Sequence, residues 1–176
     1  DKFAFSDDSR TTLGTGLSSA RAFMGGMANS GTAGYFGGGD SGEVSTVDKF
    51  AFSDDSRTTL GTGLSVGRQG LGGMANSGTA GYFGGGYGGG YLATVDKFAF
   101  SDDSRTTLGT GLSSSRYGVA GAANSGTAGY FGGGSGGSYL ATVDKFAFSD
   151  DSRTTLGTGL SVARSHPAGM ANAESL

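Results

Sequence analysis

Four identical copies of one stretch, DKFAFSDDSRTTLGTGLS, dominate this chain. They occupy residues 1–18, 48–65, 96–113 and 144–161, so the copies start 47, 48 and 48 residues apart. A second constant stretch, ANSGTAGYFGGG, begins at Ala28, Ala75 and Ala123. A period of this size is typical of solenoids, propellers and related arrays, in which each repeat is one supersecondary unit. Any single motif must therefore be interpreted within the repeat.

Each repeat contains four short segments with strand character. In the repeat that starts at Arg68 they are residues 70–75, 79–84, 94–100 and 106–112. In the third segment Asp96, Phe98 and Phe100 are predicted to face one way and the residues between them the other, which is the period of two of a strand. The glycines of the fourth segment weaken its strand propensity. Four strands followed by a repeat predict an all-β protein.

Turn signals separate these segments, and helix signals are weak. Residues 76–78, Asn-Ser-Gly, favour a tight turn, and the Ser-Asp-Asp-Ser run at 101–104 favours a polar turn whose side chains bond their own backbone. The best helix candidate, residues 18–27, contains two glycines and no capping box. The loop after each aromatic segment varies between copies.

Composition excludes several classes of protein. Gly is abundant, with 38 residues, but 12 Phe and 7 Tyr in regular positions indicate an ordered β protein rather than a linker. Cys is absent, which rules out disulfides and thiolate metal sites. The net charge of −3 shows no basic excess, so no nucleic-acid partner is expected, and no apolar run is long enough to predict a membrane helix. No targeting segment is visible in the sequence.

Read from its Arg, the repeat resembles a kelch repeat over essentially the whole chain. The matching residues are Arg68, Gly78, Tyr82, Phe83, Gly84, Gly85, Phe98, Phe100, Asp102 and Thr106. Two positions depart from the family pattern: the last-strand Trp is Leu, at residues 13, 60, 108 and 156, and the third-strand Tyr is Phe. The repeats are also similar, more weakly, to Gly-rich kelch-like tracts in presumed virion structural proteins of marine phages.

The resemblance implies a kelch-like β-propeller of four-stranded antiparallel blades. Its first strand would lie nearest the axis, and Phe98 and Phe100 would pack between adjacent blades. About four blades are expected in a single repeat domain, 1–176. Residues 1–20 would supply the third and fourth strands of a split blade, 164–176 the first strand of a split blade, and 21–67, 68–115 and 116–163 the full blades.

Ring closure is the open question in this arrangement. A blade made from both ends of the chain would lack its second strand, because TAGYFGG has no fourth copy. A substitute strand from Glu174–Leu176, a second chain that completes a larger ring, and a longer array of repeats are three ways to supply it. Identical repeats with unpaired edges favour pairing between chains, so self-association into a homodimer or a larger homo-oligomer is expected.

An Arg recurs at the entrance to each predicted innermost strand. The four residues are Arg21, Arg68, Arg116 and Arg164. In a ring they would line one mouth of the channel and could bind a carboxylate, a phosphate or a sulfated glycan. The alternative is that each Arg pairs with an Asp of its own or the next repeat, which the neutral charge of each repeat favours.

The other candidate motifs favour structural roles. The Asp-Asp-Ser turns lack the spacing of a calcium loop and are predicted to cap backbone N–H groups. The Gly-rich stretches lack the Lys and the helix of a phosphate-binding loop. The pair Tyr82–Phe83 is predicted to be buried. Each reactive residue type recurs in the same setting in every repeat, and only His166 breaks this symmetry. No enzyme activity, metal or cofactor is therefore predicted.

The sequence favours a non-catalytic binding or structural module, because loops on a rigid scaffold carry function. The working surface would be the variable loops 37–45, 84–92 and 132–140 with the variable starts 22–26, 69–73, 117–121 and 165–169. Expected contacts for a protein or glycan partner are Tyr87, Tyr91, Tyr117 and Tyr139. A phage or cell-surface appendage is the expected context. Open alternatives are a structural or filamentous array, a carbohydrate-active enzyme, and an engineered or recently amplified repeat without a selected ligand.

Overall fold

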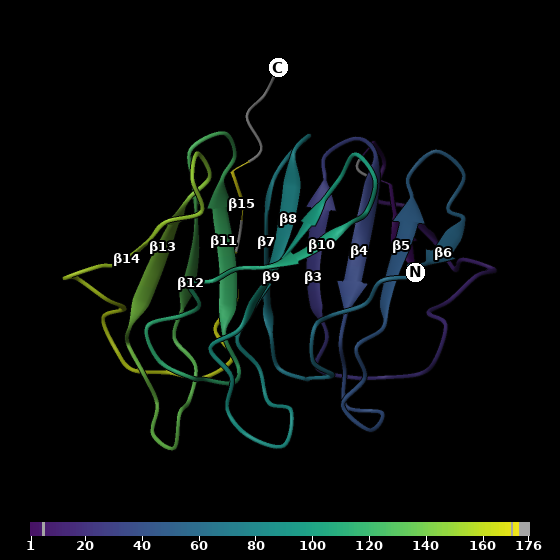
Figure 1. The fold of residues 1–176 in the computed structure, drawn as a ribbon. Helices are drawn as coiled ribbons and strands as arrows, with labels where there is room; N and C mark the ends of the chain where they lie inside the picture. The colour runs from purple at the N-terminus through teal and green to yellow at the C-terminus, as the bar shows by residue number, and fades with distance from the viewer. Residues whose placement is uncertain (5, 170, 173–176) are drawn as a thin grey trace.

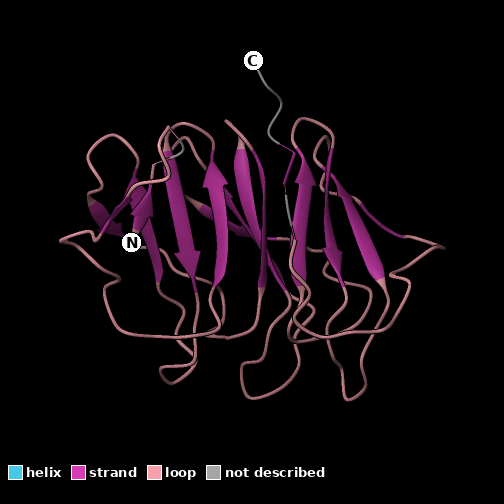
Figure 2. Ribbon diagram, turned by 180° about the vertical axis from the view of Figure 1, so that it is seen from behind, coloured by secondary structure: helices cyan, strands magenta, loops and turns pink. Residues whose placement is uncertain are grey.

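The computed structural model describes residues 1–4, 6–169 and 171–172, and within them the chain is all-β, with no helix (Figures 1 and 2). The strands of the flanking segments are β1 (Lys2–Phe3), β2 (Arg10–Thr11) and β15 (Ala171–Asn172). Those of the first repeat, 21–67, are β3 (Gly25–Asn29), β4 (Ala33–Gly37), β5 (Val47–Ala51) and β6 (Arg57–Thr59). The second repeat, 68–115, forms β7 (Gly72–Asn76), β8 (Ala80–Gly84), β9 (Val95–Ala99) and β10 (Arg105–Thr107). The third, 116–163, forms β11 (Ala120–Asn124), β12 (Ala128–Gly132), β13 (Val143–Ala147) and β14 (Arg153–Thr155).

Each repeat folds into one four-stranded antiparallel sheet whose strands follow chain order. The sheet orders are β3-β4-β5-β6, β10-β9-β8-β7 and β14-β13-β12-β11-β15, and β1 pairs with β2 in a small separate sheet. The pairing register is the same in every repeat: Tyr82 lies opposite Lys97, as Tyr35 lies opposite Lys49. The last strand differs, because β15 joins β11 in parallel. Residues 174–176, the candidate substitute strand, lie outside the described residues.

The predicted strands agree with the observed ones except at the fourth segment. The first three segments of the second repeat match β7, β8 and β9 to within two residues at each end. The fourth was expected over 106–112, but β10 ends at Thr107. Beyond it, Gly111 lies so close to the Ala93 carbonyl that a side chain would overlap with it. The chain there is tied to the third strand and to the segment that leads into it by isolated bonds, from Leu108 N to Val95 O (2.9 Å) and from Leu112 N to Ala93 O (2.7 Å).

The hydrophobic core lies between successive repeats. One cluster joins Met27, Tyr35, Val47 and Leu64 of the first repeat to Leu71, Phe83, Phe98 and Phe100 of the second. The equivalent cluster joins Met74, Tyr82, Val95 and Leu112 to Val119, Phe131 and Phe146, with Phe148 packed against it. Because side chains alternate across a strand, one face of the second repeat's sheet packs on the first repeat and the other face on the third. The predictions that Phe98 and Phe100 pack between repeats and that Tyr82–Phe83 is buried are confirmed.

The first strands of successive repeats approach one another most closely. A side chain at Gly73 would overlap with the backbone of Gly26, and one at Gly121 with the backbone of Gly73. Gly169 stands in the same relation to Gly121. The small residues of the predicted first strand are therefore required because backbone packs directly on backbone.

The connections are segregated to two ends of the molecule. Since neighbouring strands are antiparallel, the 1–2 and 3–4 turns lie at one end, the turn end, at the top of Figure 1. The long 2–3 connections and the segments that lead into each first strand lie at the other end, the loop end, at the bottom of Figure 1. The outer strands β6 and β14 lie on opposite sides of the molecule in this view.

Candidate functional site

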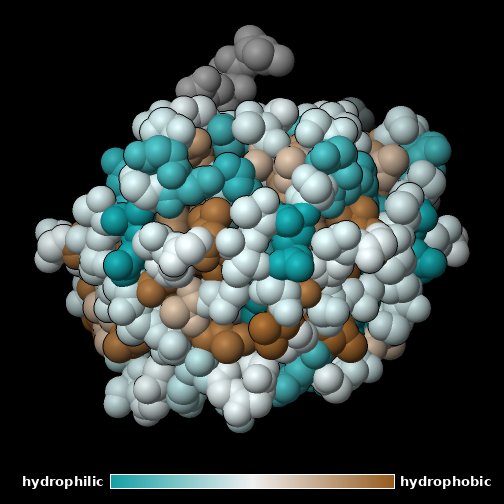
Figure 3. Space-filling model, viewed as in Figure 1, coloured by the Kyte–Doolittle hydropathy of each residue, from teal (hydrophilic) through white to brown (hydrophobic). Residues whose placement is uncertain are grey.

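The loop end holds almost all positions at which the repeats differ. Its connections span residues 38–46, 85–94 and 133–142, and its lead-in segments precede β3, β7, β11 and β15. On the face shown in Figure 3, hydrophilic residues are concentrated in the upper half, hydrophobic residues form a band below them, and the loop end is mostly of intermediate hydropathy. The variable residues therefore lie at one end of the molecule, below the apolar band in this view.

A buried ion pair supports the loop end in each full repeat. The guanidinium Nη2 atoms of Arg21, Arg68 and Arg116 lie 2.9, 3.0 and 2.8 Å from Oδ2 of Asp48, Asp96 and Asp144, and all six side chains are inaccessible to solvent. Arg and Asp belong to the same repeat, as one of the two sequence interpretations predicted. A ligand would reach these three Arg side chains only by displacing their Asp partners.

Hydrogen bonds keep the buried Asp ionised. Burial alone would raise the pKa of Asp96, but the Arg68 charge and hydrogen bonds from Thr107 and Ser65 outweigh it, so the pKa lies below its usual value. Thr107 Oγ1 donates to Asp96 Oδ1 at 2.7 Å, and the backbone N–H of Ser65 donates to Oδ2 at 2.9 Å. Because Ser65 precedes the repeat, the same carboxylate also anchors the lead-in segment.

The fourth predicted Arg has a different environment. Arg164 is exposed, its Nε donates to the Val162 carbonyl at 3.2 Å, and no carboxylate lies within ion-pair distance of it among the described residues. The structure therefore does not place the four Arg side chains as one equivalent set.

Four lead-in residues form a backbone ladder at the centre of the loop end. Gly70 N donates to Phe23 O (2.7 Å), Gly118 N to Gly70 O (2.7 Å), and His166 N to Gly118 O (2.8 Å). All four have left-handed backbone, with φ of 55, 63, 68 and 54° in chain order from Phe23 to His166. Left-handed φ is strained for Phe and His but not for Gly. Strain of this kind is concentrated at functional positions.

Three aromatic rings gather over this ladder. The ring centroid of His166 lies 4.9 Å from that of Tyr117 and 6.2 Å from that of Phe23. The glycines of the ladder make room for the rings, because a side chain at Gly70 would overlap with Tyr117 and one at Gly118 with Ser165 and His166. Tyr117 was predicted from the sequence as a contact residue, whereas Phe23 lay within the predicted variable start 22–26 but was not singled out. The sequence contains one indication of its role: Phe23 follows Arg21 by two residues, just as His166 follows Arg164.

The other predicted contact residues lie further along the loops. Tyr87 and Tyr91 pack edge to face, with centroids 5.8 Å apart, and Tyr91 is 43% exposed. Tyr139 is the most exposed of the set at 68%. Short bridges hold these loops, from Tyr87 to Gln69 and from Ser135 to both Tyr117 and Tyr139. All four predicted tyrosines are thus at the loop end, but only Tyr117 joins the central cluster.

The turn end repeats one hydrogen-bonded design. The first Asp of each Asp-Asp-Ser turn caps the backbone, as Asp102 does by accepting from Ser104 N at 3.0 Å, and this contact with Ser104 lowers the pKa of Asp102. The second Asp holds the preceding repeat: Asp103 accepts from Tyr35 Oη (2.9 Å) and Lys49 Nζ (2.7 Å). The capping prediction is confirmed, whereas the contact between repeats was not predicted.

The same contact joins the next pair of repeats; we call it the latch, in which the second Asp of a turn accepts from a Tyr and a Lys of the preceding repeat. Asp151 accepts from Tyr82 Oη at 2.8 Å and Lys97 Nζ at 2.7 Å, and burial together with Asp151 raises the pKa of Tyr82. The aromatic ring of each Tyr stacks on a Phe of the following repeat, at 5.3 Å for Tyr35 and Phe100. Within the described ranges, no three His, Asp or Glu side chains are placed to share a metal ion.

Comparisons with known proteins do not classify the chain. No protein-family model matches the sequence, and no curated protein matches it. Over residues 1–4, 6–169 and 171–172 the structure has no helix that is long and apolar enough to cross a membrane.

Proposed function

We propose that this chain is a kelch-like β-propeller that acts as a non-catalytic binding or structural module and presents its loop end to a protein or glycan partner. One observation carries the proposal. The residues that are identical in every repeat build the interfaces and latches, whereas almost all differing residues lie together at the loop end. A scaffold that holds variable loops is the usual design of a binding surface.

The loop-end ladder supports arrangement of the repeats around an axis. Direct backbone hydrogen bonds join the lead-in residues from Phe23 through Gly70 and Gly118 to His166, so successive repeats are closer here than the roughly 10 Å at which sheets pack face to face. The ring centroids of Phe23 and His166 are 6.2 Å apart, and Tyr117 contacts the same His. First and last repeats approach each other in this way when successive sheets rotate about a common line, as the blades of a propeller do.

The composition of the loop end supports binding rather than catalysis. Its exposed large hydrophobic side chains include three aromatic ones, Phe23, Tyr91 and Tyr139, each at least 43% exposed. Aromatic rings supply large contact areas to protein partners and stacking surfaces to sugars. Titratable side chains below them, such as Arg68 and Asp96, are committed to buried ion pairs. The arrangement therefore provides aromatic contact area, and these buried ion pairs are not free for acid–base chemistry.

A binding screen with loop-end variants tests this function. The immobilised chain would be screened against a glycan array and a displayed-peptide library, and each hit measured again with Tyr91→Ser and Tyr139→Ser. We expect at least about tenfold weaker binding by these variants. The control Thr106→Ala changes an exposed side chain on outer strand β10 and should bind normally. A ligand that binds both Tyr variants with the wild-type affinity, or an absence of hits, would contradict a loop-end binding site.

Self-association into a structural array is the second candidate function. In the third repeat, Tyr130 and Lys145 are the equivalents of Tyr82 and Lys97, yet no described carboxylate bonds to them. Asp8, the equivalent of Asp103, has the same left-handed backbone and no described side-chain partner. A second copy would join these ends through the latch used between repeats. Native mass spectrometry of the wild type and Lys145→Glu tests this: a discrete oligomer or ladder lost in the variant supports it, and a wild-type monomer contradicts it.

A further inference from the structure

We propose that Tyr87 and Tyr91, at the loop end of the second repeat, are a modification site at which a peroxide-dependent one-electron oxidant joins the two rings as dityrosine. The rings pack edge to face, with centroids 5.8 Å apart, and both belong to the variable loop 84–92. The chain has no Cys, so no disulfide can fix this Gly-rich loop, whereas a bond between the two rings closes it covalently. Such a bond forms whether or not the loop end binds a partner.

The backbone of the loop places the two rings side by side. Tyr87 and Tyr91 lie directly opposite each other in an antiparallel bridge. Hydrogen bonds flank the pair, one from Gly88 N to Gly90 O (3.0 Å) and one from Leu92 N to the carbonyl just before Tyr87 (2.9 Å). This is the pattern of a non-hydrogen-bonded pair, in which the side chains of opposite residues are closest. The fold of the loop therefore makes the two phenol rings neighbours.

Both tyrosines are accessible from solvent, and one of them has room to move. Tyr91 is 43% exposed and Tyr87 is half-buried. The residues between them, 88–90, are all Gly, and a side chain at either of the last two would meet no atom within 4 Å. Tyr87 is held from its other side by two backbone bonds with Gln69, of 2.8 and 3.0 Å. Because Tyr87 is fixed and the Gly run is flexible, Tyr91 can close the remaining distance between the rings.

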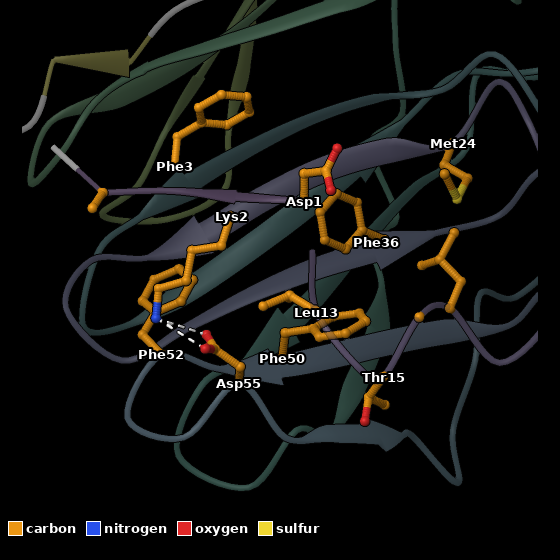
Figure 4. A pocket seen from close by; sticks show the side chains of 13 residues that line it. Asp1, Lys2, Phe3, Leu13, Thr15, Met24, Phe36, Phe50, Phe52 and Asp55 are labelled. Carbon is orange, nitrogen blue, oxygen red and sulfur yellow. Dashed lines mark hydrogen bonds and ion pairs between the residues drawn. The ribbon is translucent and has the colours of Figure 1, made fainter. Parts of the chain in front are cut away.

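Other aromatic rings of the molecule meet without a second Tyr. The groove between the β1–β2 sheet and the first repeat, with a volume of about 680 Å³, is lined by four Phe side chains and no Tyr (Figure 4). The two latch tyrosines stack on Phe, and Tyr117 contacts His166. Phe and His form no phenoxyl radical. Within the part of the chain that the structure describes, Tyr87 and Tyr91 are therefore the one pair of phenol rings in contact.

The coupling reaction balances with hydrogen peroxide as the oxidant. Each phenol loses one electron and one proton from its hydroxyl group, and the two radicals form a bond between ring carbons adjacent to the hydroxyl-bearing carbons. The ring protons at the new bond then move to the oxygens, which restores both phenols. One peroxide takes up the two electrons and two protons and becomes two water molecules. Cys, the side chain most readily oxidised, is absent, so no thiol of the chain consumes the radicals.

The third repeat contains the same bridge with a single Tyr. Ser135 takes the place of Tyr87 and lies opposite Tyr139, and the backbone bonds that flank the pair recur at 3.2 and 2.9 Å. Tyr139 is more exposed than Tyr91, at 68% against 43%. Exposure alone would therefore favour oxidation in the third loop, whereas pairing of the rings favours the second.

Treatment of the dilute protein with a haem peroxidase and hydrogen peroxide tests the proposal. We expect the blue fluorescence of dityrosine in chains that have not been cross-linked to one another. The tryptic peptide 69–97 should be lighter by two hydrogen atoms, and its fragment spectrum should lack backbone cleavages between Tyr87 and Tyr91. The equivalent peptide of the third repeat, 117–145, should keep its mass. Its three tyrosines make it an internal control for oxidation without pairing.

Three variants identify the pair. Tyr87→Phe keeps the ring but forms no phenoxyl radical, so the fluorescence and the mass loss should both disappear. Tyr139→Phe removes the more exposed but unpaired phenol and should leave both signals unchanged. Ser135→Tyr builds the pair in the third repeat and should add a loss of two hydrogen atoms in peptide 117–145.

An unchanged mass of peptide 69–97 in the oxidised wild type would overturn the proposal, as would fluorescence confined to covalent dimers of the chain. Equal fluorescence from Tyr87→Phe and Tyr139→Phe would overturn it too, because the yield would then follow exposure rather than pairing. Ser135→Tyr without a second mass loss would show that the bridge does not direct the coupling, which also contradicts it.

Discussion

At the interface between the second and third repeats Tyr82, Phe131 and Phe146 are almost completely shielded from solvent, whereas at the loop end Tyr139 keeps 68% of its surface exposed. The interface residues recur in every repeat, and the loop-end residues change from copy to copy. One small sheet cannot bury enough apolar surface by itself, so its stability must come from its neighbours. The difference separates two roles: constant faces hold the repeats together, and the loop end is free to vary.

Removing an interface Phe should produce the largest effect. Phe83→Ala should lower the free energy of unfolding by about 3–5 kcal/mol, because it leaves a cavity between two repeats. Phe36→Ala, the same change where the ring is 40% exposed, should cost about 1–2 kcal/mol. Urea denaturation of both variants measures the difference. Equal losses would show that packing between repeats is not the main source of stability.

Acid should weaken the buried ion pairs, with an effect summed over three sites. The pKa values of Asp48, Asp96 and Asp144 are all lowered in the folded chain, because bonds from Arg, Thr and Ser outweigh burial. A lowered folded pKa contributes stability that is complete above the unfolded value of about 3.9 and is lost as the pH falls through the folded value. The urea midpoint should therefore be steady from pH 7 to 5 and fall by pH 3. A constant midpoint would contradict this account.

The latch at the turn end should contribute less than a buried Phe. Tyr82→Phe removes the 2.8 Å hydrogen bond to Asp151 and should cost about 1.5 kcal/mol, the lower end for a charged acceptor, because Asp151 stays partly hydrated. Tyr130→Phe removes the equivalent hydroxyl where no described acceptor bonds to it. Its effect should be within about 0.5 kcal/mol. Thermal denaturation compares the two variants, and a larger loss for Tyr130→Phe would show that the hydroxyl contributes elsewhere.

The smallest expected difference concerns the loop-end ladder. Gly118→Ala and Gly126→Ala both place a side chain on left-handed backbone, with φ of 68 and 80°. Only the new methyl group at 118 would overlap with neighbours, Ser165 and His166. Gly118→Ala should therefore be less stable than Gly126→Ala by about 1 kcal/mol. Equal stabilities by urea denaturation would mean that the aromatic cluster is not packed against the ladder.

The features that were predicted correctly from the sequence are those that follow from the alternation of side chains along one strand. The period of two in residues 95–100 correctly predicted that Phe98 and Phe100 share one face and that Val95 lies on the other, because a strand has only two faces. The neutral charge of the repeat correctly favoured pairing of Arg68 with an Asp. The fourth strand was predicted too long, since the contact of Gly111 with Ala93 depends on how the sheet folds back.

The contacts that sequence reasoning missed depend on the placement of one repeat on the next. Nothing local to Asp103 indicates that it receives Tyr35 and Lys49 from a repeat more than 50 residues earlier. The positive φ of Phe23 and His166 runs against the preference of both residue types. The meeting of their rings depends on the arrangement of four repeats, which alternation within one repeat does not specify.

The distance between the outer strands tests the central claim, that the sheets are arranged around an axis. The chain has no Cys, so Thr58→Cys on β6 and Thr154→Cys on β14 allow specific spin labelling. In a ring the outer strands of the first and third repeats point away from each other. Double electron–electron resonance should then give a distance of about 35 Å or more between the two spin labels. A straight stack of sheets spaced about 10 Å apart would give about 20 Å, and that result would contradict the account.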